Sequence, residues 1–362
     1  MKIKMYNILY LLPNYNINGG TPKKTLDLIR KSNNNCFVYV WSNDHNEFKY
    51  LFENSKANLY EGPFGRNIIK HLSYLLKIID KHNIQLAQTQ FSFGELLGYL
   101  LKFNRPKLKV IIAFVGPFSP NGIKKMIANQ IYKNTDAFVF ISNYVKKEKM
   151  ISFPLLKNKY SKLIYNGTDI RESEKCNYQK PEGEILILAI SGLIKIKNIQ
   201  VLIKCLEILQ KKVTSKVKFR VAGDGPLHDH LKEMIKERNL ECYFDLIGYD
   251  DNIGGLMTLT DIFVHPCYDE GFGIAVAEAM IAEKPIIVAN AGALPELIEN
   301  EKTGLIVDPF KAEEWANAII RLKNDKIFAN QLAHNAKKKA EAEFSIEKFV
   351  ANYEQLYHKL LN

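Results

Sequence analysis

The sequence predicts an α/β protein of two domains, each built around a doubly wound, Rossmann-like parallel sheet. Apolar runs of strand length alternate with segments of helical apolar spacing along the 362 residues, which is the order of a βαβ chain. That length exceeds what one hydrophobic core usually serves. A content of 47% hydrophobic and 25% charged residues is ordinary for a globular protein. We therefore expect two cores.

The first half of the chain carries six expected strands with helical segments between them. The segment around Leu72 is typical of these helices, because its apolar residues recur every three or four positions from Ile68 to Ile79. The strands are expected at residues 7–12, 36–41, 84–90, 108–115, 137–141 and 162–165.

A polar stretch at residues 171–184 has no apolar periodicity and interrupts the alternation. We place the interdomain linker there, with an N-terminal domain over residues 1–170 and a second domain over residues 171–344. The second half repeats the pattern, with strands near 185–190, 217–222, 243–247, 261–265, 286–289 and 305–307.

The C-terminal segment forms a final amphipathic helix over residues 345–362. Its apolar stripe must pack on one of the two domains, and the pattern leaves both placements open. The stripe consists of Ile346, Phe349, Val350, Tyr353, Leu356, Tyr357 and Leu360.

Positive charge is concentrated in the first half. Residues 1–170 hold 25 basic and 10 acidic residues, a net charge of +15, whereas residues 171–362 hold 25 and 29, a net charge of −4. A positive field favours an anionic partner such as a lipid phosphate or a membrane face. A lysine-rich solvated surface explains the same count, and both interpretations stay open.

The remaining composition indicates a cytoplasmic protein without a membrane span. The apolar runs are far shorter than the roughly 20 residues that cross a bilayer, and the start of the chain fits a buried strand better than a signal peptide. The cysteines are odd in number and lack CxxC spacing, which favours reduced thiols. They are Cys36, Cys176, Cys205, Cys242 and Cys267.

The most informative segment, residues 269–280, places Glu270 and Glu278 eight positions apart around a glycine turn that opens a helix. The preceding residues 261–265 predict a strand that Pro266 ends. At 3.6 residues per turn the two carboxylates lie roughly on one face, so one ligand can meet both. Glutamate pairs at this spacing are also common on solvated helices, and the glycine turn favours the binding site.

The start of that helix has the features of an anion site. The N–H groups of Phe272, Gly273 and Ile274 stand at the helix start, where main-chain donors have no acceptor within the helix and can point at an anion. Gly271 and Gly273 have no side chain, so a ligand can approach the main chain closely. A nucleoside diphosphate sugar offers a diphosphate to such amides and hydroxyls to the carboxylates. The segment therefore predicts a sugar-nucleotide site.

Residues 264–304 resemble the nucleotide-sugar signature of glycosyltransferase family 4, whose members are retaining enzymes of the GT-B fold. The resemblance implies two Rossmann-like domains facing a central cleft, with residues 345–362 crossing back onto the N-terminal, acceptor-side domain. It assigns Glu270 to the hydroxyls of the donor sugar and Glu278 to the ribose. Further blocks fit in order at 284–290, 291–298 and 303–307.

A second block, residues 189–203, predicts a strand, a loop with lysines and a helix. The resemblance implies an arginine and a lysine that clamp the donor diphosphate. Lys197 matches the lysine, but Gly192 stands at the arginine position, so Lys195 or main-chain amides would have to replace that half of the clamp. A lysine beside a helix start is also common on plain surfaces.

Several glycines complete the predicted site. Gly19 and Gly20 match the family's phosphate-approaching loop, although such a pair by itself is ordinarily a turn. Gly223 and Gly248 resemble turns near the base pocket. The predicted catalytic residues are Glu270 and Lys197, and the predicted donor-binding residues are Gly19, Gly20, Gly192, Lys197, Gly223, Gly248, Glu270, Gly271, Phe272, Gly273, Ile274 and Glu278.

Two departures from the family concern the acceptor side and a thiol. Val115 stands where many members have a histidine, and Cys267 stands where many have a serine. We expect Cys267 to be a buried structural thiol, since no adjacent base is evident.

The segment at residues 120–133 places Ile123, Met126, Ile127 and Ile131 on one helix face beside lysines. Such a face suits a membrane or a lipid-linked acceptor. A core-packing helix has the same pattern, and we favour core packing.

The resemblance implies transfer of a hexosyl or N-acetylhexosaminyl unit from a nucleoside diphosphate sugar, with a UDP-sugar favoured, to an acceptor hydroxyl with retention of configuration. It implies no cofactor and no metal, which the absence of a DxD run beside a strand also suits. We expect a lipid-linked or oligosaccharide acceptor in bacterial polysaccharide, O-antigen, capsule or lipopolysaccharide assembly, in the cytoplasm or at the inner face of the cell membrane.

The sequence also bears on three other functions. A sugar-nucleotide-binding protein without transferase activity is the alternative, because the family arginine and histidine are absent. A dehydrogenase would need a glycine fingerprint that Gly19-Gly20 does not supply. Nucleic-acid binding is disfavoured, because no basic and aromatic motif of a known module is present.

Overall fold

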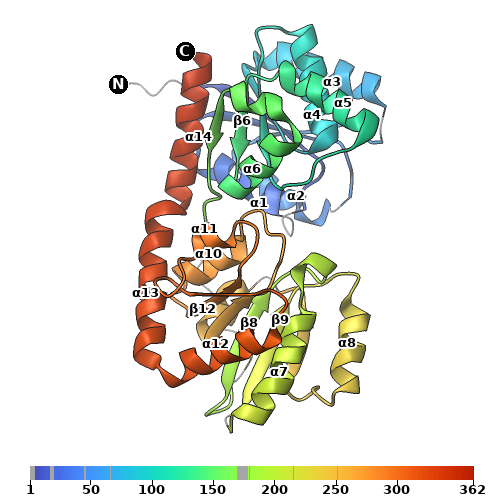
Figure 1. The fold of residues 1–362 in the computed structure, drawn as a ribbon. Coiled ribbons are helices and arrows are strands. Elements are labelled where there is room, and N and C mark those ends of the chain that lie inside the picture. Colours follow the sequence, from blue (N-terminus) through green and yellow to red (C-terminus); the bar gives the residue numbers. More distant parts are fainter. Residues whose placement is uncertain are drawn as a thin grey trace. The chain divides into compact units, whose positions relative to one another are not determined.

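The computed structural model describes residues 5–16, 20–44, 46–65, 67–168, 178, 180–214, 216–250 and 252–362. The chain divides into two compact units (Figure 1). Unit 1 comprises residues 1–167 and 346–362, and unit 2 comprises residues 168–345. The sequence-based boundaries were 170/171 and 344/345. Residues 171–177 and 179 of the predicted linker lie outside the described residues.

Unit 1 contains a seven-stranded sheet in the order β3-β2-β1-β4-β5-β6-β7, and every neighbouring pair is parallel. The doubly wound sheet predicted for this half is confirmed. Its strands are β1 (Asn7–Leu12), β2 (Asn35–Val40), β3 (Asn58–Glu61), β4 (Leu86–Thr89), β5 (Lys109–Phe114), β6 (Ala137–Phe140) and β7 (Ser161–Leu163).

The helices of unit 1 cover both faces of this sheet. They are α1 (Gly20–Lys31), α2 (Lys49–Glu53), α3 (Ile68–His82), α4 (Phe91–Asn104), α5 (Gly122–Lys133), α6 (Asn143–Ser152) and α14 (Ile346–Leu361), with the short 3-10 helices η1 (Asn46–Phe48) and η2 (Pro154–Asn158).

Unit 2 contains a six-stranded parallel sheet in the order β10-β9-β8-β11-β12-β13. Its strands are β8 (Ile185–Ile190), β9 (Val217–Ala222), β10 (Phe244–Gly248), β11 (Ile262–His265), β12 (Ile286–Ala289) and β13 (Leu305–Val307). Its helices are α7 (Gln200–Lys212), α8 (His228–Glu237), α9 (Ile253–Leu259), α10 (Ile274–Ile281), α11 (Leu294–Leu297), α12 (Ala312–Asn324) and α13 (Lys326–Glu343), with the 3-10 turn η3 (Lys195–Lys197).

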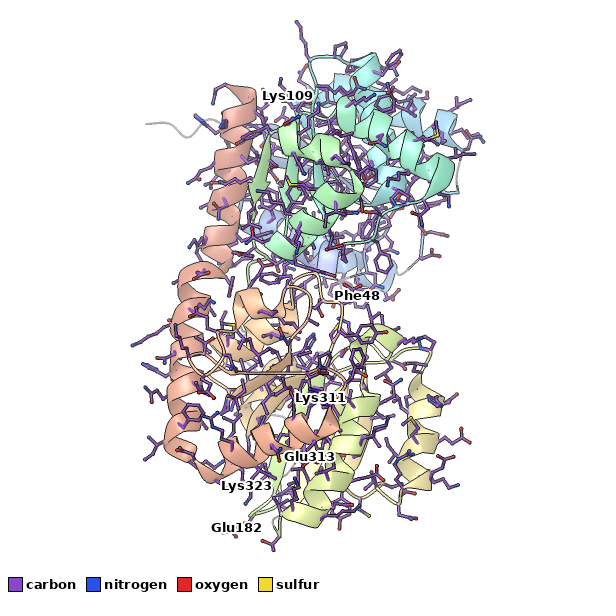
Figure 2. The ribbon with its side chains drawn as sticks, viewed as in Figure 1. Phe48, Lys109, Glu182, Lys311, Glu313 and Lys323 are labelled. Atoms are coloured by element: carbon purple, nitrogen blue, oxygen red, sulfur yellow. The ribbon has the colours of Figure 1, made fainter. Side chains whose placement is uncertain are left out.

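Helices α7 and α12 pack side by side on the sheet of unit 2 (Figure 1). An exposed ion pair between Lys212 and Glu313 joins them, and Figure 2 shows Glu313 at the surface of α12. Surface pairs of this kind contribute little to stability. The apolar faces beneath, including Leu206 and Trp315, supply the packing, since both side chains are fully buried.

Strand β1 explains why the strands of unit 1 are apolar throughout instead of alternating. Ile8, Tyr10 and Leu12 enter one hydrophobic core, and Leu9 and Leu11 enter the other, on the opposite face of the sheet. A parallel sheet covered on both sides buries every residue of a central strand.

Strand β3 was missed by the sequence analysis. It lies at the edge of the sheet and has only four residues, Asn58–Glu61, none of which is fully buried. An edge strand covered on fewer sides needs no apolar run, so its hydrophobic pattern is weak.

The expectation that the helix around residues 120–133 packs its whole apolar stripe in the core is wrong. Ile131 is buried, but Ile123, Met126 and Ile127 are exposed. The core contacts of α5 are made by Ala128, Ile131 and Tyr132, so the helix uses a different face from the one that the spacing suggested.

No helix among the described residues combines the length and hydropathy that crossing a bilayer requires. Helix α13 is the longest of unit 2, with 18 residues, but it carries several lysines and glutamates.

Helix α14 packs on the core that contains β1 and α1, through Ile346, Phe349, Val350 and others of its stripe. Its Tyr357 hydroxyl donates a hydrogen bond to Gln88 Oε1 at 2.7 Å and lies 3.3 Å from the Tyr10 hydroxyl. This buried polar contact fixes the register of the last helix against the sheet of unit 1.

We predict that Tyr357→Phe lowers the free energy of unfolding by about 1–2 kcal/mol, because Gln88 loses a buried donor. Urea denaturation followed by circular dichroism measures the change. Tyr50→Phe is the control, since Tyr50 is 55% exposed and should change stability little. Equal stability of the two variants would show that the hydroxyl of Tyr357 contributes nothing.

Candidate functional site

The loops that follow the carboxyl ends of the strands of unit 2 meet one another through main-chain hydrogen bonds. Leu193 N donates to Asp224 O at 3.0 Å, Tyr268 N donates to Ile196 O at 3.0 Å, and Ala293 N donates to Glu270 O at 2.8 Å. This edge of an open parallel sheet is where α/β proteins bind ligands. Residues from four βα connections therefore form one continuous surface.

Two glycines permit this close packing. A Cβ atom on Gly223, at φ +137°, would lie 2.1 Å from Ser191 O, and one on Gly292, at φ +57°, would lie 2.4 Å from Glu270 O. Both conformations favour glycine as well. Gly223 N also donates to Gly248 O at 2.7 Å, so the loops after β8, β9 and β10 are held together.

The centre of the surface is an ion pair between Lys197 of η3 and Glu270 of the loop after β11. Lys197 Nζ donates to Glu270 Oε2 at 2.6 Å, although the two residues are 73 positions apart in the sequence. The lysine side chain is 21% exposed and the glutamate side chain 15% exposed. The structure thus brings together the two predicted catalytic residues.

A histidine that the sequence analysis did not assign completes the group. His265, the last residue of β11, lies 2.8 Å through Nε2 from the same Oε2 atom of Glu270. Because a carboxylate only accepts, Nε2 carries the proton, and the buried Nδ1 has no partner among the described residues. A histidine at the end of a buried strand, five positions before the glutamate, was the signal available in the sequence.

The protonation states of the group follow from burial and charge together. Burial alone would raise the pKa of Glu270, but the hydrogen bond from His265 and the charge of Lys197 outweigh it and hold this pKa well below its usual range. Burial opposes the charge of Lys197 too, yet Glu270 raises that pKa overall. Burial lowers the pKa of His265, which is therefore neutral at pH 7. The result is a carboxylate and an ammonium ion beside a neutral imidazole.

The nearby thiol is structural in character, as predicted. Cys267 is fully buried, and burial raises its pKa to about 12. His265, Cys267 and Glu270 offer ligand atoms within 4.8 Å of one another, a grouping that could hold a metal ion. However, the Lys197 ammonium already bonds Glu270, and a protonated thiol is a poor ligand. The group therefore suits a lysine better than a metal.

The glycine turn and helix after Glu270 form as predicted. Gly273, at φ +102°, precedes α10 without a side-chain cap. The first intrahelical bond runs from Ala277 N to Gly273 O, so the amides of Ile274 and the next two residues have no acceptor within the helix. Phe272 is buried and packs edge-on against Phe344, with ring centroids 5.6 Å apart. Its side chain thus anchors the turn in the core.

The remaining predicted residues are distributed over both units. Glu278 lies on α10 and is 8% exposed, and Gly192 is an exposed residue of the loop after β8. Gly20 is the first residue of α1 in unit 1, and Gly19 lies outside the described residues. Unit 2 therefore contributes all the predicted site residues except Gly19 and Gly20.

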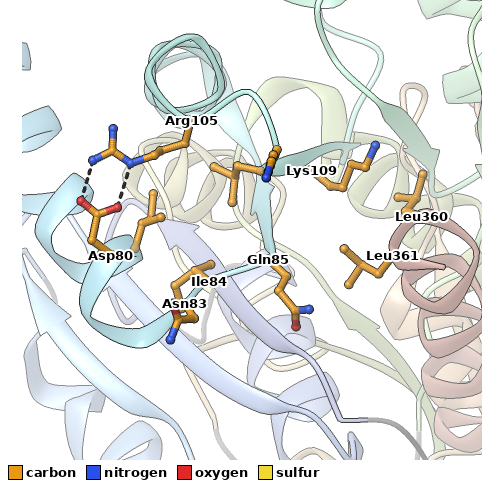
Figure 3. A pocket seen from close by; sticks show the side chains of 11 residues that line it. Asp80, Asn83, Ile84, Gln85, Arg105, Lys109, Leu360 and Leu361 are labelled. Atoms are coloured by element: carbon orange, nitrogen blue, oxygen red, sulfur yellow. Dashed lines mark hydrogen bonds and ion pairs between the residues drawn. The ribbon is translucent and has the colours of Figure 1, made fainter.

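Unit 1 has a separate hollow of about 460 Å³ between the ends of α3, α4 and α14. Figure 3 shows Arg105 bonded to Asp80, with Leu360 and Leu361 on the opposite side. Gln85 and Lys109 place this hollow at the amino ends of β4 and β5. Ligands of doubly wound sheets bind at the carboxyl ends instead, so the surface of unit 2 is the stronger candidate.

We predict that Lys197→Met destabilises the protein by about 3–5 kcal/mol, because it leaves the Glu270 carboxylate buried without its counter-ion. Adding Glu270→Gln to that variant should recover part of the lost stability. Urea denaturation of the wild type, the two single variants and the double variant gives the coupling energy between the two side chains.

The exposed pair Lys212 and Glu313 is the control for this cycle. Its coupling energy should stay below about 1 kcal/mol, since its side chains are 40% and 56% exposed. A coupling at Lys197 and Glu270 no larger than that of the control would contradict the assignment of a buried pair.

Known proteins share sequence similarity with this chain. Residues 170–339 match the family model described as glycosyl transferases group 1. N-acetyl-alpha-D-glucosaminyl L-malate synthase of Bacillus anthracis is 26% identical over 198 residues, 55% of this chain and 51% of that protein. Poly(ribitol-phosphate) alpha-N-acetylglucosaminyltransferase of Staphylococcus aureus is 27% identical over 331 residues, 87% of this chain and 66% of that protein. The chain thus spans between about half and two thirds of the length of these relatives.

Solved structures match both units. The glycosyltransferase from Rickettsia africae superimposes with a TM-score of 0.85 at 19% identity, over 99% of both chains. Anabaena HepE in complex with UDP and glucose gives a TM-score of 0.82 at 20% identity, over 98% of this chain and 100% of that chain. The chain therefore has the GT-B fold, and its residues 170–339 match the glycosyl transferases group 1 model.

Proposed function

We propose that this protein is a retaining glycosyltransferase that moves a sugar from a nucleoside diphosphate sugar to an acceptor hydroxyl. The observation that carries the proposal is the largely buried group of Lys197, Glu270 and His265 beside the start of α10. It combines a fixed positive charge, a fixed carboxylate and helix amides without intrahelical acceptors, which are the partners that a diphosphate and a sugar require.

Lys197 has the geometry to neutralise the leaving diphosphate. Its ammonium carries three N–H donors, and among the described residues one of them bonds Glu270. A further donor would bond a phosphate oxygen. Because Glu270 holds the ammonium in place, its charge is preorganised for the negative charge that develops as the glycosidic bond breaks.

Glu270 is suited to hold the donor sugar. Both hydrogen bonds from Lys197 and His265 converge on Oε2, which leaves Oε1 outside this pair of bonds and able to accept from a sugar hydroxyl. The low pKa of the carboxyl keeps it an acceptor at neutral pH. Glu278, which lies within α10 eight residues after Glu270, would hold the ribose.

Metal independence is part of the proposal. The positive charge that a divalent ion would supply to the diphosphate is supplied by Lys197 and the amino end of α10. No protein base near Glu270 is assigned to the acceptor, because His265 donates to the carboxylate and is fully buried. A donor phosphate oxygen would then take the proton of the acceptor hydroxyl on the same face of the sugar, which gives retention.

Relatives support the choice of donor and acceptor class. HepE binds UDP and glucose, and another similar protein from Escherichia coli is named UDP-Gal:alpha-D-GlcNAc-diphosphoundecaprenol alpha-1,3-galactosyltransferase, with 31% identity over 140 residues. A third is named as an O-antigen biosynthesis glycosyltransferase. We propose a UDP-hexose or UDP-N-acetylhexosamine donor and a lipid-linked or oligosaccharide acceptor in cell-surface polysaccharide assembly, in the cytoplasm.

The alternative is a protein that binds the sugar nucleotide without transferring the sugar, which Gly192 in place of the family arginine favours. Release of nucleoside diphosphate in the presence of an acceptor panel separates the two functions. A binding protein would show ligand-induced stabilisation and no acceptor-dependent release.

We predict that one class of nucleoside diphosphate sugar stabilises the wild-type protein by about 2.7 kcal/mol at a concentration 100-fold above Kd. Glu278→Ala should lose most of this stabilisation, because the ribose hydroxyls lose their acceptor. A thermal-shift panel of UDP- and GDP-sugars measures both.

Two further variants make that panel specific. Glu278→Gln keeps an acceptor oxygen and should lose less, and Glu283→Ala should keep the full shift, because Glu283 pairs with His334 and Lys337 at the surface. If Glu278→Ala is stabilised as strongly as the wild type, Glu278 does not hold the ribose.

We predict that Gly192→Arg strengthens donor binding by about tenfold or more, the value of a charge-assisted bond to a phosphate. The site can accept the side chain, because Gly192 is exposed, its φ is not positive, and an added Cβ would meet only Asp224 O at 3.7 Å. Isothermal titration with the donor identified above measures the change.

Gly192→Gln is the matched control, since it has similar length and no charge. The gain should be specific to Gly192→Arg and absent for the free nucleoside, which lacks the diphosphate. Equal donor affinity of the arginine and glutamine variants would rule out a diphosphate position beside residue 192.

A further inference from the structure

Unit 1 exposes four large apolar side chains within ten residues of sequence. Phe118 is 78% exposed, Ile123 is 76%, Met126 is 71% and Ile127 is 49%. These four residues, here called the α5 patch, lie on the loop after β5 and on the first turns of α5, an outer helix of unit 1 in Figure 1. Single exposed apolar residues are ordinary on a protein surface, but several large ones within ten residues of sequence indicate an interaction site.

Helical geometry places three of these side chains on one face. Ile123, Met126 and Ile127 stand at positions i, i+3 and i+4, whereas the helix packs on unit 1 through Ala128 and Ile131. The core of unit 1 is therefore complete without the patch. Packing leaves the patch outside, so its exposure does not come from an unfinished core.

The loop that carries Phe118 is anchored from beneath. Lys149, only 5% exposed, donates to the Phe118 carbonyl oxygen and lies 4.8 Å from the centre of the Phe114 ring. Tyr132 donates to the buried Glu95 at 3.2 Å. The bond from Lys149 holds the main chain of the loop at Phe118, whose side chain is exposed to solvent.

The sequence segment that carries the patch has charges of one sign. Residues 115–134 contain Lys124, Lys125 and Lys133 and no aspartate or glutamate. Lys124 and Lys133 are exposed, and Lys125 lies over the Phe153 ring at 5.7 Å. Apolar side chains flanked by lysines match the two layers of an anionic lipid surface, in which acyl chains lie beneath phosphates.

We propose that the α5 patch docks on the surface of an anionic lipid bilayer, with its four apolar side chains in the acyl boundary and Lys124 and Lys133 against the phosphates. A stable protein interface uses about 20–30 residues a side, which the patch does not approach. A bilayer accepts a small group of this kind, because it closes around each side chain. The proposal concerns an interaction surface and does not require the proposed transferase activity.

Vesicle flotation tests the proposal with the full chain. We expect the wild type to float with vesicles of phosphatidylglycerol and phosphatidylcholine and to remain in solution with phosphatidylcholine alone. The triple variant Ile123→Ser, Met126→Ser and Ile127→Ser should bind about tenfold more weakly. The double variant Lys124→Gln and Lys133→Gln should bind more weakly and lose part of the salt dependence.

Matched controls remove exposed apolar residues elsewhere. Ile69→Ser, on α3 of unit 1, and Ile327→Ser, on α13 of unit 2, change residues that are 80% and 84% exposed and should float as the wild type does. Wild type that stays in solution with the anionic vesicles, or a triple variant that floats equally well, would overturn the proposal. The first of these outcomes would leave a protein partner as the occupant.

The thermal-shift panel with nucleoside diphosphate sugars keeps the two proposals separable. The triple variant should keep its donor-induced stabilisation, which also shows that it folds. Wild type that floats but binds no donor would support the lipid surface and reject the transferase.

Discussion

The largely buried ion pair between Lys197 and Glu270 is the interaction on which the candidate site depends. Removing two charges from water costs several kcal/mol per ion, and this cost is offset because Nζ and Oε2 lie 2.6 Å apart and His265 adds a second bond to the same oxygen. The pair can form only when η3 and the loop after β11 are both in place. The site is therefore a consequence of the folded sheet of unit 2.

The parallel sheet supplies that condition. Each βα connection leaves the same edge, so residues 73 positions apart in sequence reach hydrogen-bond distance. Glycine makes the loops compatible, since Gly223 and Gly292 stand where any Cβ would overlap a neighbouring carbonyl. The proposed chemistry uses what this packing leaves: an ammonium held by a carboxylate, and helix amides without intrahelical acceptors.

Unit 1 differs from unit 2 in its positive charge and in the apolar side chains that it exposes. Its two cores are closed by α14 on one face and by α3 and α4 on the other, and its net positive charge accompanies the exposed α5 patch. If both proposals hold, donor chemistry belongs to the residues of unit 2, and attachment to the lipid that carries or surrounds the acceptor belongs to unit 1.

The sequence by itself determined the two α/β sheets, the strand positions other than β3, and the glycine turn between Glu270 and α10, because local periodicity and turn chemistry encode these features. Tertiary structure alone decided that His265 bonds Glu270 and that Ile123, Met126 and Ile127 face solvent. The apolar stripe left the packing of α14 open between the two domains, and only the family resemblance implied the N-terminal one, on which it packs. Each of these depends on which distant residues become neighbours. An apolar stripe in the sequence shows that one face of a helix is hydrophobic. Whether that face is covered depends on which neighbours pack against it in the folded protein.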